Sequence, residues 1–287
     1  MNKIKRKIKL SENVYRMDVE APLIASERKA GQFIILSLDD NYAERIPLTI
    51  ADANTKEGTI TLIFQVVGAT TKKLSRLEKG DFIDNLLGPL GKPTHIEKFG
   101  TVVCVGGGIG VAPMHPIAQE MKNAGNKVIS IIGARNKELL ILEEEFKRLS
   151  DELIICTDDG SYGRKALVTE PLKEICSKIP PPDLVIAIGP PIMMKFCSIT
   201  TKPFNIKTLV SLNTIMVDGT GMCGGCRVTV GGQTKFVCVD GPEFDGHLVD
   251  FDNMMKRLNA FKNIERKKFE DECKLETEIK KMEKKNG

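Results

Sequence analysis

The sequence predicts a small antiparallel β-barrel followed by an α/β domain, a cysteine-containing domain and a charged helical tail. Short β-rich runs bounded by turn residues come first, and apolar strands alternating with helical patterns follow. Cysteines then gather in a glycine-rich stretch near the C-terminus. We therefore expect domains at residues 1–97, 98–212 and 213–252, with the tail at 253–287.

The first domain contains β-rich runs that end in clusters of Gly, Pro, Asn or Asp, as strands do. The predicted strands are Ile4–Leu10, Val14–Glu20, Gln32–Ser37, Arg45–Ala51, Thr59–Val66 and Asp81–Leu86. One or two helical turns fit Thr70–Leu77. Short strands at this spacing are typical of a small barrel.

The second domain alternates apolar strands with helical patterns, which predicts a five-stranded parallel sheet covered on both faces. The strands are Thr101–Val105, Lys127–Ile132, Glu152–Cys156, Leu184–Ile188 and Lys207–Leu212. The helices are Ala112–Asn123, Leu140–Leu149, Leu167–Lys178 and Ile192–Thr200. The breaker-rich stretch Gly88–Pro93 is the expected boundary with the barrel.

The tail is highly charged, with apolar residues at loosely helical spacing through Met254–Lys285. This pattern predicts one or two amphipathic helices. They either cover their own domain or dock a partner chain.

Composition excludes several classes of function. Hydrophobic residues make up 41% and charged residues 28%, and the net charge is +4, which is an ordinary globular balance. No basic stripe interleaved with aromatic residues suggests nucleic acid, and no apolar run reaches the roughly 18 residues of a membrane span. No apolar run follows the basic N-terminal stretch, so we expect no secretory signal.

Most of the cysteines are scattered singly through apolar patterns, which is typical of free thiols in a reducing compartment. These scattered residues are Cys104, Cys156, Cys176, Cys197 and Cys273. We therefore expect a cytoplasmic protein.

The remaining cysteines have the spacing of a metal site. Cys223 and Cys226 lie in the glycine-rich stretch, and we expect Cys238 on a later strand. A plant-type [2Fe–2S] site has the spacing C-x4-C-x2-C followed by a distant Cys, and here Asp218 stands at the first position. The predicted ligands Asp218, Cys223, Cys226 and Cys238 fit either a cluster with one carboxylate ligand or a tetrahedral zinc site.

A glycine loop, Gly106–Gly110, follows the first parallel strand and opens a helix. Glycines let the backbone approach a phosphate, and a helix N-terminus offers N–H groups to it. The Rossmann fingerprint is absent, because Val111 takes the place of its last glycine and no acidic residue ends the second strand. The loops Thr157–Gly163 and Gly189–Met194 fall at the same edge of the sheet, so we predict a nucleotide site there.

These motifs resemble the ferredoxin–NADP reductase superfamily. Gly107–Met114 is similar to its nicotinamide loop, and Gly189–Met193 is similar to its G-P-x-x-M motif. Arg45–Thr49 is similar to its flavin motif, with one extra residue between Arg and Thr, and Gly68–Leu74 resembles its second phosphate loop.

The resemblance implies FAD and NAD(H) as cofactors, with the hydroxyl of Thr49 near flavin N5 in a catalytic role. It implies an FAD site formed by Arg45, Pro47, Leu48, Thr49, Ile63, Phe64, Gln65, Gly68, Thr70 and Thr71. It implies an NAD(H) site formed by Gly107, Gly108, Ile109, Gly110, Arg135, Asp158, Asp159, Gly160, Gly189, Pro190 and Met193. Arg135 could also contact a 2′-phosphate, but the resemblance favours NAD(H) over NADP(H).

One branch of the superfamily joins this flavin reductase to a C-terminal [2Fe–2S] loop. Asp218 and Gly241–His247 resemble the small subunit of the NADH-dependent reduced ferredoxin:NADP oxidoreductase (Nfn type). The resemblance implies an electron-transfer subunit of an electron-bifurcating complex. Its partner would be a larger flavin and iron–sulfur subunit that handles NADP(H) and ferredoxin.

Two alternatives remain open. The same cofactors could serve as the electron-transfer subunit of dihydroorotate dehydrogenase, whose cluster has four Cys ligands. The chain could instead be a zinc-stabilised nucleotide-binding module.

Overall fold

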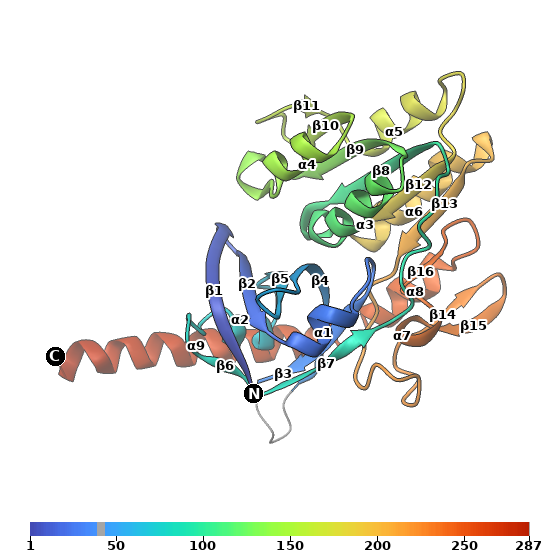
Figure 1. Cartoon of the computed structure of the whole chain (residues 1–287). Coiled ribbons are helices and arrows are strands. Elements are labelled where there is room, and N and C mark those ends of the chain that lie inside the picture. The colour runs from blue at the N-terminus through green and yellow to red at the C-terminus, as the bar shows by residue number, and fades with distance from the viewer. Residues whose placement is uncertain (39–43, 287) are drawn as a thin grey trace.

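The computed structural model describes residues 1–38 and 44–286, and its first sheet is an antiparallel near-barrel (Figure 1). Its strands are β1 (Asn2–Ser11), β2 (Val14–Glu20), β3 (Phe33–Ser37), β4 (Ile46–Asn54), β5 (Thr59–Gln65), β6 (Phe82–Ile83) and β7 (Asn85–Leu90). The order is β6-β1-β2-β5-β4-β3-β7, so the two edge strands are separated in the chain by Asp84 alone. The sheet therefore curls until its edges meet, which confirms the predicted barrel.

Local features of this domain differ from the prediction. Asp81–Leu86 is not one strand, because the chain switches between the two sheet edges at Asp84. Strand β7 also runs into the expected boundary stretch. Helix α2 (Ala69–Leu74) is shorter than predicted, and α1 (Pro22–Glu27), which begins on a proline, was not predicted.

The second sheet is parallel through its centre, as predicted. Its strands are β8 (Thr101–Gly107), β9 (Lys127–Ala134), β10 (Glu152–Thr157), β11 (Arg164–Lys165), β12 (Leu184–Ile188), β13 (Lys207–Ser211) and β16 (Glu243–Asp245). The order is β11-β10-β9-β8-β12-β13-β16, with the two-residue strand β11 at one edge and the antiparallel strand β16 at the other. The five predicted strands lie between these two edges.

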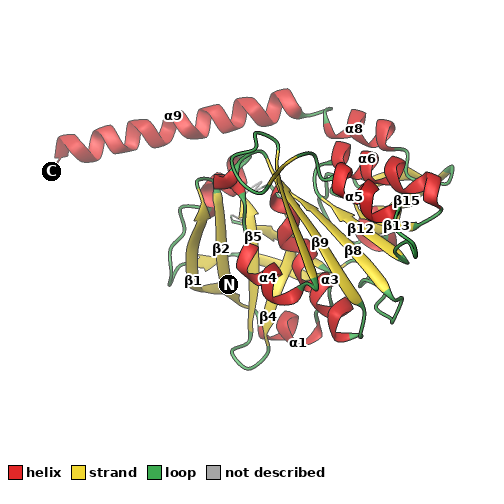
Figure 2. Cartoon of the chain, turned by 90° about the horizontal axis from the view of Figure 1, so that it is seen from above, coloured by secondary structure: helices red, strands yellow, loops and turns green. Residues whose placement is uncertain are grey.

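Helices cover both faces of this sheet (Figure 2). They are α3 (Val111–Asn123), α4 (Glu143–Leu149), α5 (Thr169–Cys176) and α6 (Pro191–Thr201), and the short turns are η1 (Gly108–Gly110), η2 (Lys137–Leu139) and η3 (Lys202–Phe204). Val102 and Cys104 pack with α3 and α4, whereas Val103 and Val105 pack with α5 and α6, because alternate strand residues face opposite sides. The helix predicted from Leu140 begins at Glu143, because Leu142 has φ 58°, outside the right-handed helical region.

The cysteine-containing region forms the hairpin β14 (Arg227–Val230) and β15 (Gln233–Phe236), followed by the helical turn α7 (Val237–Asp240). The strand expected around Cys238 is wrong, because Cys238 lies on α7. Asp240 accepts a hydrogen bond from the amide of Phe236 at 2.7 Å, which ends the strand there.

The charged tail forms two helices, α8 (Phe251–Leu258) and α9 (Lys262–Asn286), as predicted. Helix α9 packs against α2 on the barrel, where Arg76 Nη1 lies 2.6 Å from Glu272 Oε1 (Figure 1). The scattered residues Cys104, Cys156, Cys176 and Cys197 are buried thiols, and Cys273 is half-buried on α9. Across residues 1–38 and 44–286, no helix combines the length and apolarity of a membrane span.

Candidate functional site

The predicted nucleotide residues meet at the carboxyl edge of the parallel sheet. Gly107 at the end of β8 pairs with Gly133, and Ile188 at the end of β12 pairs with Gly106. The loops after these strands therefore leave the sheet side by side. Arg135 follows β9, and the loop Asp158–Gly160 follows β10 at the same edge.

Close packing joins the glycine loop to the loop after β12. A Cβ on Gly110 would lie 2.3 Å from the carbonyl oxygen of Ile188 and 2.6 Å from Cα of Gly189. A Cβ on Gly107 would lie 2.3 Å from Sδ of Met193. By contrast, Gly108 has φ +54° and no atom within 4 Å of its Cβ position, so its backbone is open to a ligand at the start of α3.

The remaining nucleotide candidates are exposed. Asp159 accepts a hydrogen bond from the Ser161 amide at 2.9 Å, and hydrogen bonds from Ser161 hold the pKa of its carboxyl below the usual value. This carboxylate therefore shapes its own turn. Asp158 and Arg135 are exposed just after β10 and β9, and their roles toward NAD(H) stay predictions.

The flavin candidates of the barrel lie on neighbouring strands. Pro47, Leu48 and Thr49 are half-buried on β4, and β4 pairs with β5, which carries the remaining strand candidates. Phe64 is buried in the barrel core and stacks on Tyr15 with ring centroids 6.0 Å apart, and its place in the FAD site stays a prediction.

On β5, Ile63 is buried against α3 and Gln65 is half-buried. Arg45 is exposed just before β4. Its place at the strand start is compatible with a phosphate contact, which stays a prediction.

The second phosphate loop begins at Gly68, which caps α2 and has no atom within 4 Å of its Cβ position. Thr71 Oγ1 accepts hydrogen bonds from the amides of Val67 at 3.1 Å and Gly68 at 3.0 Å. Thr70 is buried and donates to the carboxylate of Glu44. The threonines therefore hold the loop, and Gly68 leaves its backbone open to a ligand.

The two domains bring the flavin strands against the nicotinamide loop. Helix α3 packs on β4, and η1 contacts β5. Ala51 and Ile63 share one apolar core with Val111 and Ala112. The backbone of the glycine loop therefore lies beside the strand that carries Thr49.

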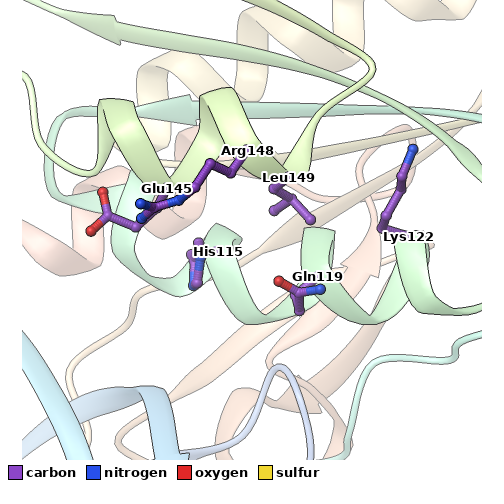
Figure 3. Close-up of a pocket in the computed structure, with 6 residues that line it drawn as sticks. All are labelled: His115, Gln119, Lys122, Glu145, Arg148 and Leu149. Carbon is purple, nitrogen blue, oxygen red and sulfur yellow. The ribbon is translucent and has the colours of Figure 1, made fainter.

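No sequence pattern singled out His115, which lies on α3 and contacts both domains. Its ring lies against the carbonyl of Ala51, at a bulge where β4 shifts register against β5, and edge-on to Phe146 with centroids 5.6 Å apart. Burial lowers the pKa of His115, which favours the neutral imidazole. In Figure 3 it lines a cavity of about 320 Å³ between α3 and α4, together with Gln119, Lys122, Glu145, Arg148 and Leu149.

The four predicted metal ligands form two pairs. Cys226 Sγ and Cys238 Sγ lie 3.2 Å apart and are buried. Asp218 accepts hydrogen bonds from the amides of Thr220 at 3.0 Å and Cys223 at 2.8 Å, and its carboxylate also contacts the Cys223 thiol. Hydrogen bonds from Thr220 and Cys223 hold the pKa of Asp218 below the usual value.

This pairing bears on the choice of metal. A zinc site needs four ligands around one ion, whereas in [2Fe–2S] proteins the four ligands are shared between two irons. Two pairs of ligands therefore fit a two-iron cluster better than a single zinc ion.

The surroundings of the sulfurs also fit a cluster. The Gly225 amide lies 3.4 Å from Cys223 Sγ, and the Cys238 amide lies 3.5 Å from Cys226 Sγ. Burial raises the pKa of the Cys238 thiol to about 12, so near neutral pH this sulfur ionises only beside a strong positive charge such as a metal. Backbone amides directed at sulfurs stabilise thiolates and influence the potential of an iron–sulfur cluster.

The loop of residues 217–226, which carries three of the predicted ligands and is here called the cluster loop, packs against the barrel. Gly219 has φ +77°, and a Cβ there would lie 2.7 Å from both Ile35 Cδ1 and Leu90 Cδ1. Ile35 on β3 pairs with Pro47 on β4. The cluster loop therefore packs on β3, the strand next to the one that carries the flavin motif.

Exposed apolar side chains, here called the apolar rim, lie on the cluster loop and in the tail. Met222 is 88% exposed, Val217 49% and Phe261 53%. A groove of about 360 Å³ runs between the loop and the start of the tail, where Arg257 donates to the carbonyl of Gly225 at 3.2 Å. Apolar side chains gathered on one surface indicate an interaction site.

Comparisons with known proteins agree with this arrangement. The family description “Iron-sulfur cluster binding domain of dihydroorotate dehydrogenase B” matches residues 213–250, and “Oxidoreductase NAD-binding domain” matches residues 104–198. A Thermotoga maritima protein named “Dihydroorotate dehydrogenase B (NAD(+)), electron transfer subunit homolog” is 46% identical over 270 residues, covering 94% of this chain and 95% of that protein. The Clostridium perfringens “Dihydroorotate dehydrogenase B (NAD(+)), electron transfer subunit” is 31% identical over 252 residues, covering 87% and 97%.

A solved structure is also similar over most of the chain. Described as “Insights into flavin-based electron bifurcation via the NADH-dependent reduced ferredoxin-NADP oxidoreductase structure”, it has a TM-score of 0.88 and 45% identity. The alignment covers 94% of this chain and 97% of that chain. The fold, including the C-terminal cysteine region, is therefore shared.

Proposed function

The chain belongs to the family of dihydroorotate dehydrogenase B electron-transfer subunits and their homologues, and on that premise we propose that it serves an electron-bifurcating NADH-dependent reduced ferredoxin:NADP oxidoreductase. Family membership makes it an oxidoreductase subunit with an NAD-binding domain and an iron–sulfur domain. In this proposal it passes electrons between NAD(H), FAD and a [2Fe–2S] cluster, and to or from a larger partner subunit.

The observation that carries the proposal is the position of Asp218. Its carboxylate lies beside Cys223, where the C-x4-C-x2-C spacing requires the first ligand. We assign Asp218 and Cys223 to one iron, and Cys226 and Cys238 to the other. A carboxylate is a harder donor than a thiolate and favours the ferric state.

When bound, FAD exchanges electrons in pairs with NAD(H) and singly with the cluster. The residues of this chain position the reactants. The open backbone at Gly108 and the start of α3 hold the dinucleotide phosphates, and the packing of η1 on β5 directs the nicotinamide toward Thr49. The close packing of Gly219 against Ile35 on β3 keeps the cluster loop near the flavin strand β4.

A partner subunit is part of the proposal. The exposed apolar rim around Met222 lies at the cluster loop, where electrons would leave the chain. We propose a larger flavin and iron–sulfur subunit that handles NADP(H) and ferredoxin, in line with the solved relative. A cytoplasmic location stays a prediction from the buried thiols.

The second candidate is electron transfer for dihydroorotate dehydrogenase, favoured by the names of the relatives. Copurification distinguishes the two, because the proposal requires the NADP(H)- and ferredoxin-handling subunit rather than a dihydroorotate-oxidising one. Reduction by NADH but not by dihydroorotate, in the isolated complex, gives the same distinction.

Spectroscopy tests the ligand assignment. Asp218→Cys should assemble a cluster with a shifted reduction potential, and Asp218→Ala should change the cluster spectrum. Asp245→Ala is the matched control, because the exposed Asp245 also accepts the amide two residues later in the chain, that of His247 at 2.9 Å, and is not a predicted ligand. An unchanged spectrum in Asp218→Ala would exclude Asp218 as a ligand, and a colourless protein with zinc in place of iron would refute the whole proposal.

A further inference from the structure

The carboxyl group of Glu243, a half-buried residue, lies where the barrel, the parallel sheet and the cluster region meet. Glu243 begins β16 and pairs with Ser211 at the end of β13. Thr94, from the segment that joins the barrel to the sheet, donates its hydroxyl to Glu243 Oε1 at 2.6 Å. The electron path proposed above leaves this group without a role.

The backbone is shaped to enclose this pair. Gly31 has φ +85°, and a Cβ there would lie 2.3 Å from Thr94 Oγ1 and 3.2 Å from Glu243 Oε1. The Lys92 amide donates to the carbonyl of Gly241 at 2.6 Å. Segments from all three parts of the chain therefore close around one carboxyl group.

The position of Glu243 relates it to the electron path. Val210 on β13 pairs with Ala187, near the end of β12. The next residue, Ser211, pairs with Glu243. Glu243 therefore lies level with the carboxyl edge of the sheet. The nicotinamide loops leave the sheet at this edge.

The residue before Glu243 lies near β3, the strand that pairs with the flavin strand β4. A Cβ on Gly91 would lie 2.7 Å from Phe33 Cε1 and 3.0 Å from Cδ of Pro242, and Phe33 pairs with Thr49. Glu243 thus lies between the nicotinamide edge, the flavin strand and the cluster region.

Among residues 1–38 and 44–274, whose side chains the structure describes, no basic side chain forms an ion pair with this carboxylate. Burial raises the pKa of Glu243 to about 7, and the Thr94 hydrogen bond acts in the opposite direction. Burial, with a contribution from Glu243, raises the pKa of the Cys104 thiol on β8 to about 12, so this thiol stays neutral. Glu243 therefore changes protonation near neutral pH.

Charged side chains on the surrounding elements are directed elsewhere. His95 pairs with Glu97 at 3.1 Å, and Lys207 lies over the Phe99 ring at 5.5 Å. Asp245 is exposed and accepts from the His247 amide, and Lys29 and Lys92 are exposed.

We propose that Glu243 takes up a proton when electrons enter this chain and releases it when they leave for the partner. The inference rests on the proposed function, because it needs electrons to reside near Glu243. An added negative charge in a region of low dielectric favours the neutral acid over the carboxylate, and by linkage the protonated acid favours the reduced state.

The step balances as follows. NADH gives up two electrons and one proton and becomes NAD+, while the electrons leave singly through the cluster region. The proton stays behind. Glu243 holds it as a carboxylic acid, and returns it to solvent when the electrons have left.

Infrared difference spectroscopy of the cofactor-loaded protein tests this directly. Reduction at pH 7 to 8 should produce the C=O band of a protonated carboxyl group, and Glu243→Gln should remove it. Glutamine keeps an acceptor for Thr94 but cannot ionise. The pH dependence of the reduction potentials should flatten near pH 7 in Glu243→Gln and stay unchanged in Glu97→Gln, an exposed carboxylate control.

Thr94→Val gives a second, independent test. Without the hydroxyl donor the carboxylate is less stable, so the pH at which the infrared band titrates should rise. This variant decides the question if Glu243→Gln does not fold.

The possible failures are distinguishable. A loaded protein without the carboxyl band, or with a band that survives in Glu243→Gln, would overturn this inference alone. A purified complex without flavin and iron would overturn the proposed function and the inference together.

Discussion

Replacing Gly110 by alanine tests whether the packing beneath the glycine loop sets the nicotinamide position. Gly110 has φ −62°, a conformation that alanine adopts without strain. The added Cβ would lie 2.3 Å from the Ile188 carbonyl oxygen, 2.7 Å from its carbonyl carbon and 2.6 Å from Cα of Gly189. All three atoms belong to the backbone, so the loops must separate.

The size of the effect follows from these contacts. Overpacking typically costs about 1–3 kcal/mol of stability. Because the neighbours here are backbone atoms, which cannot rotate away, we expect a loss at the upper end of that range, about 3 kcal/mol. A shift of about 1 Å between reacting groups lowers a rate by about 100-fold. We therefore expect the rate of flavin reduction by NADH to fall about 100-fold, with flavin and iron contents unchanged.

Stopped-flow reduction by NADH and chemical denaturation provide the two measurements. Gly125→Ala is the matched control at the other end of α3, because Gly125 has φ +82° and no atom within 4 Å of its Cβ position. It should lose about 1–2 kcal/mol of stability through backbone strain and keep the wild-type rate. A wild-type rate in Gly110→Ala would refute the reasoning.

Three further outcomes are expected. Asn126→Ala should lower the free energy of unfolding by about 4 kcal/mol, because the buried Asn126 side chain hydrogen-bonds two backbone amides and two carbonyls at 2.7–3.0 Å. Chemical denaturation measures this loss, with the exposed Asn123→Ala as the control. Asp151 accepts from a lysine and a backbone amide, which lower its pKa, so its stabilisation is present above the unfolded pKa and lost as pH falls through the folded pKa. Asp151→Asn should therefore make thermal stability less dependent on pH below about 4, and an unchanged dependence would contradict this. Gly219→Ala should lower the iron content, because its Cβ would meet Ile35 and Leu90, whereas full occupancy would show that the loop seats itself elsewhere.

Local sequence patterns were enough for the large elements. The strands of the parallel sheet are continuous apolar runs, and Val102–Val105 is buried on both faces, so composition alone predicts its place. The glycine loop was also predictable, because it ends a strand and opens a helix. The C-x4-C-x2-C spacing indicated Asp218 and the three clustered cysteines as candidate metal ligands, and that assignment stays a prediction.

Features that depend on contacts between distant segments were not predictable. Cys238 lies on a helical turn because Asp240 caps it, and the short strand β16 forms only by pairing with β13. The burial of the Phe64 ring in the barrel core was not predictable either, and its place in the FAD site stays a prediction. His115 and Glu243 gain their surroundings only when the domains meet, which no local pattern records.

The packing of the cluster loop against the barrel limits which segments of this fold can be exchanged with those of other proteins. Residues 213–252 share their apolar core with the parallel sheet, and Gly219 fits against side chains of the barrel. A chimera that received this segment alone would lack the barrel surface against which the segment packs. Moving residues 213–252 into another reductase would require Ile35 and Leu90, or side chains of the same shape, to be transferred with them.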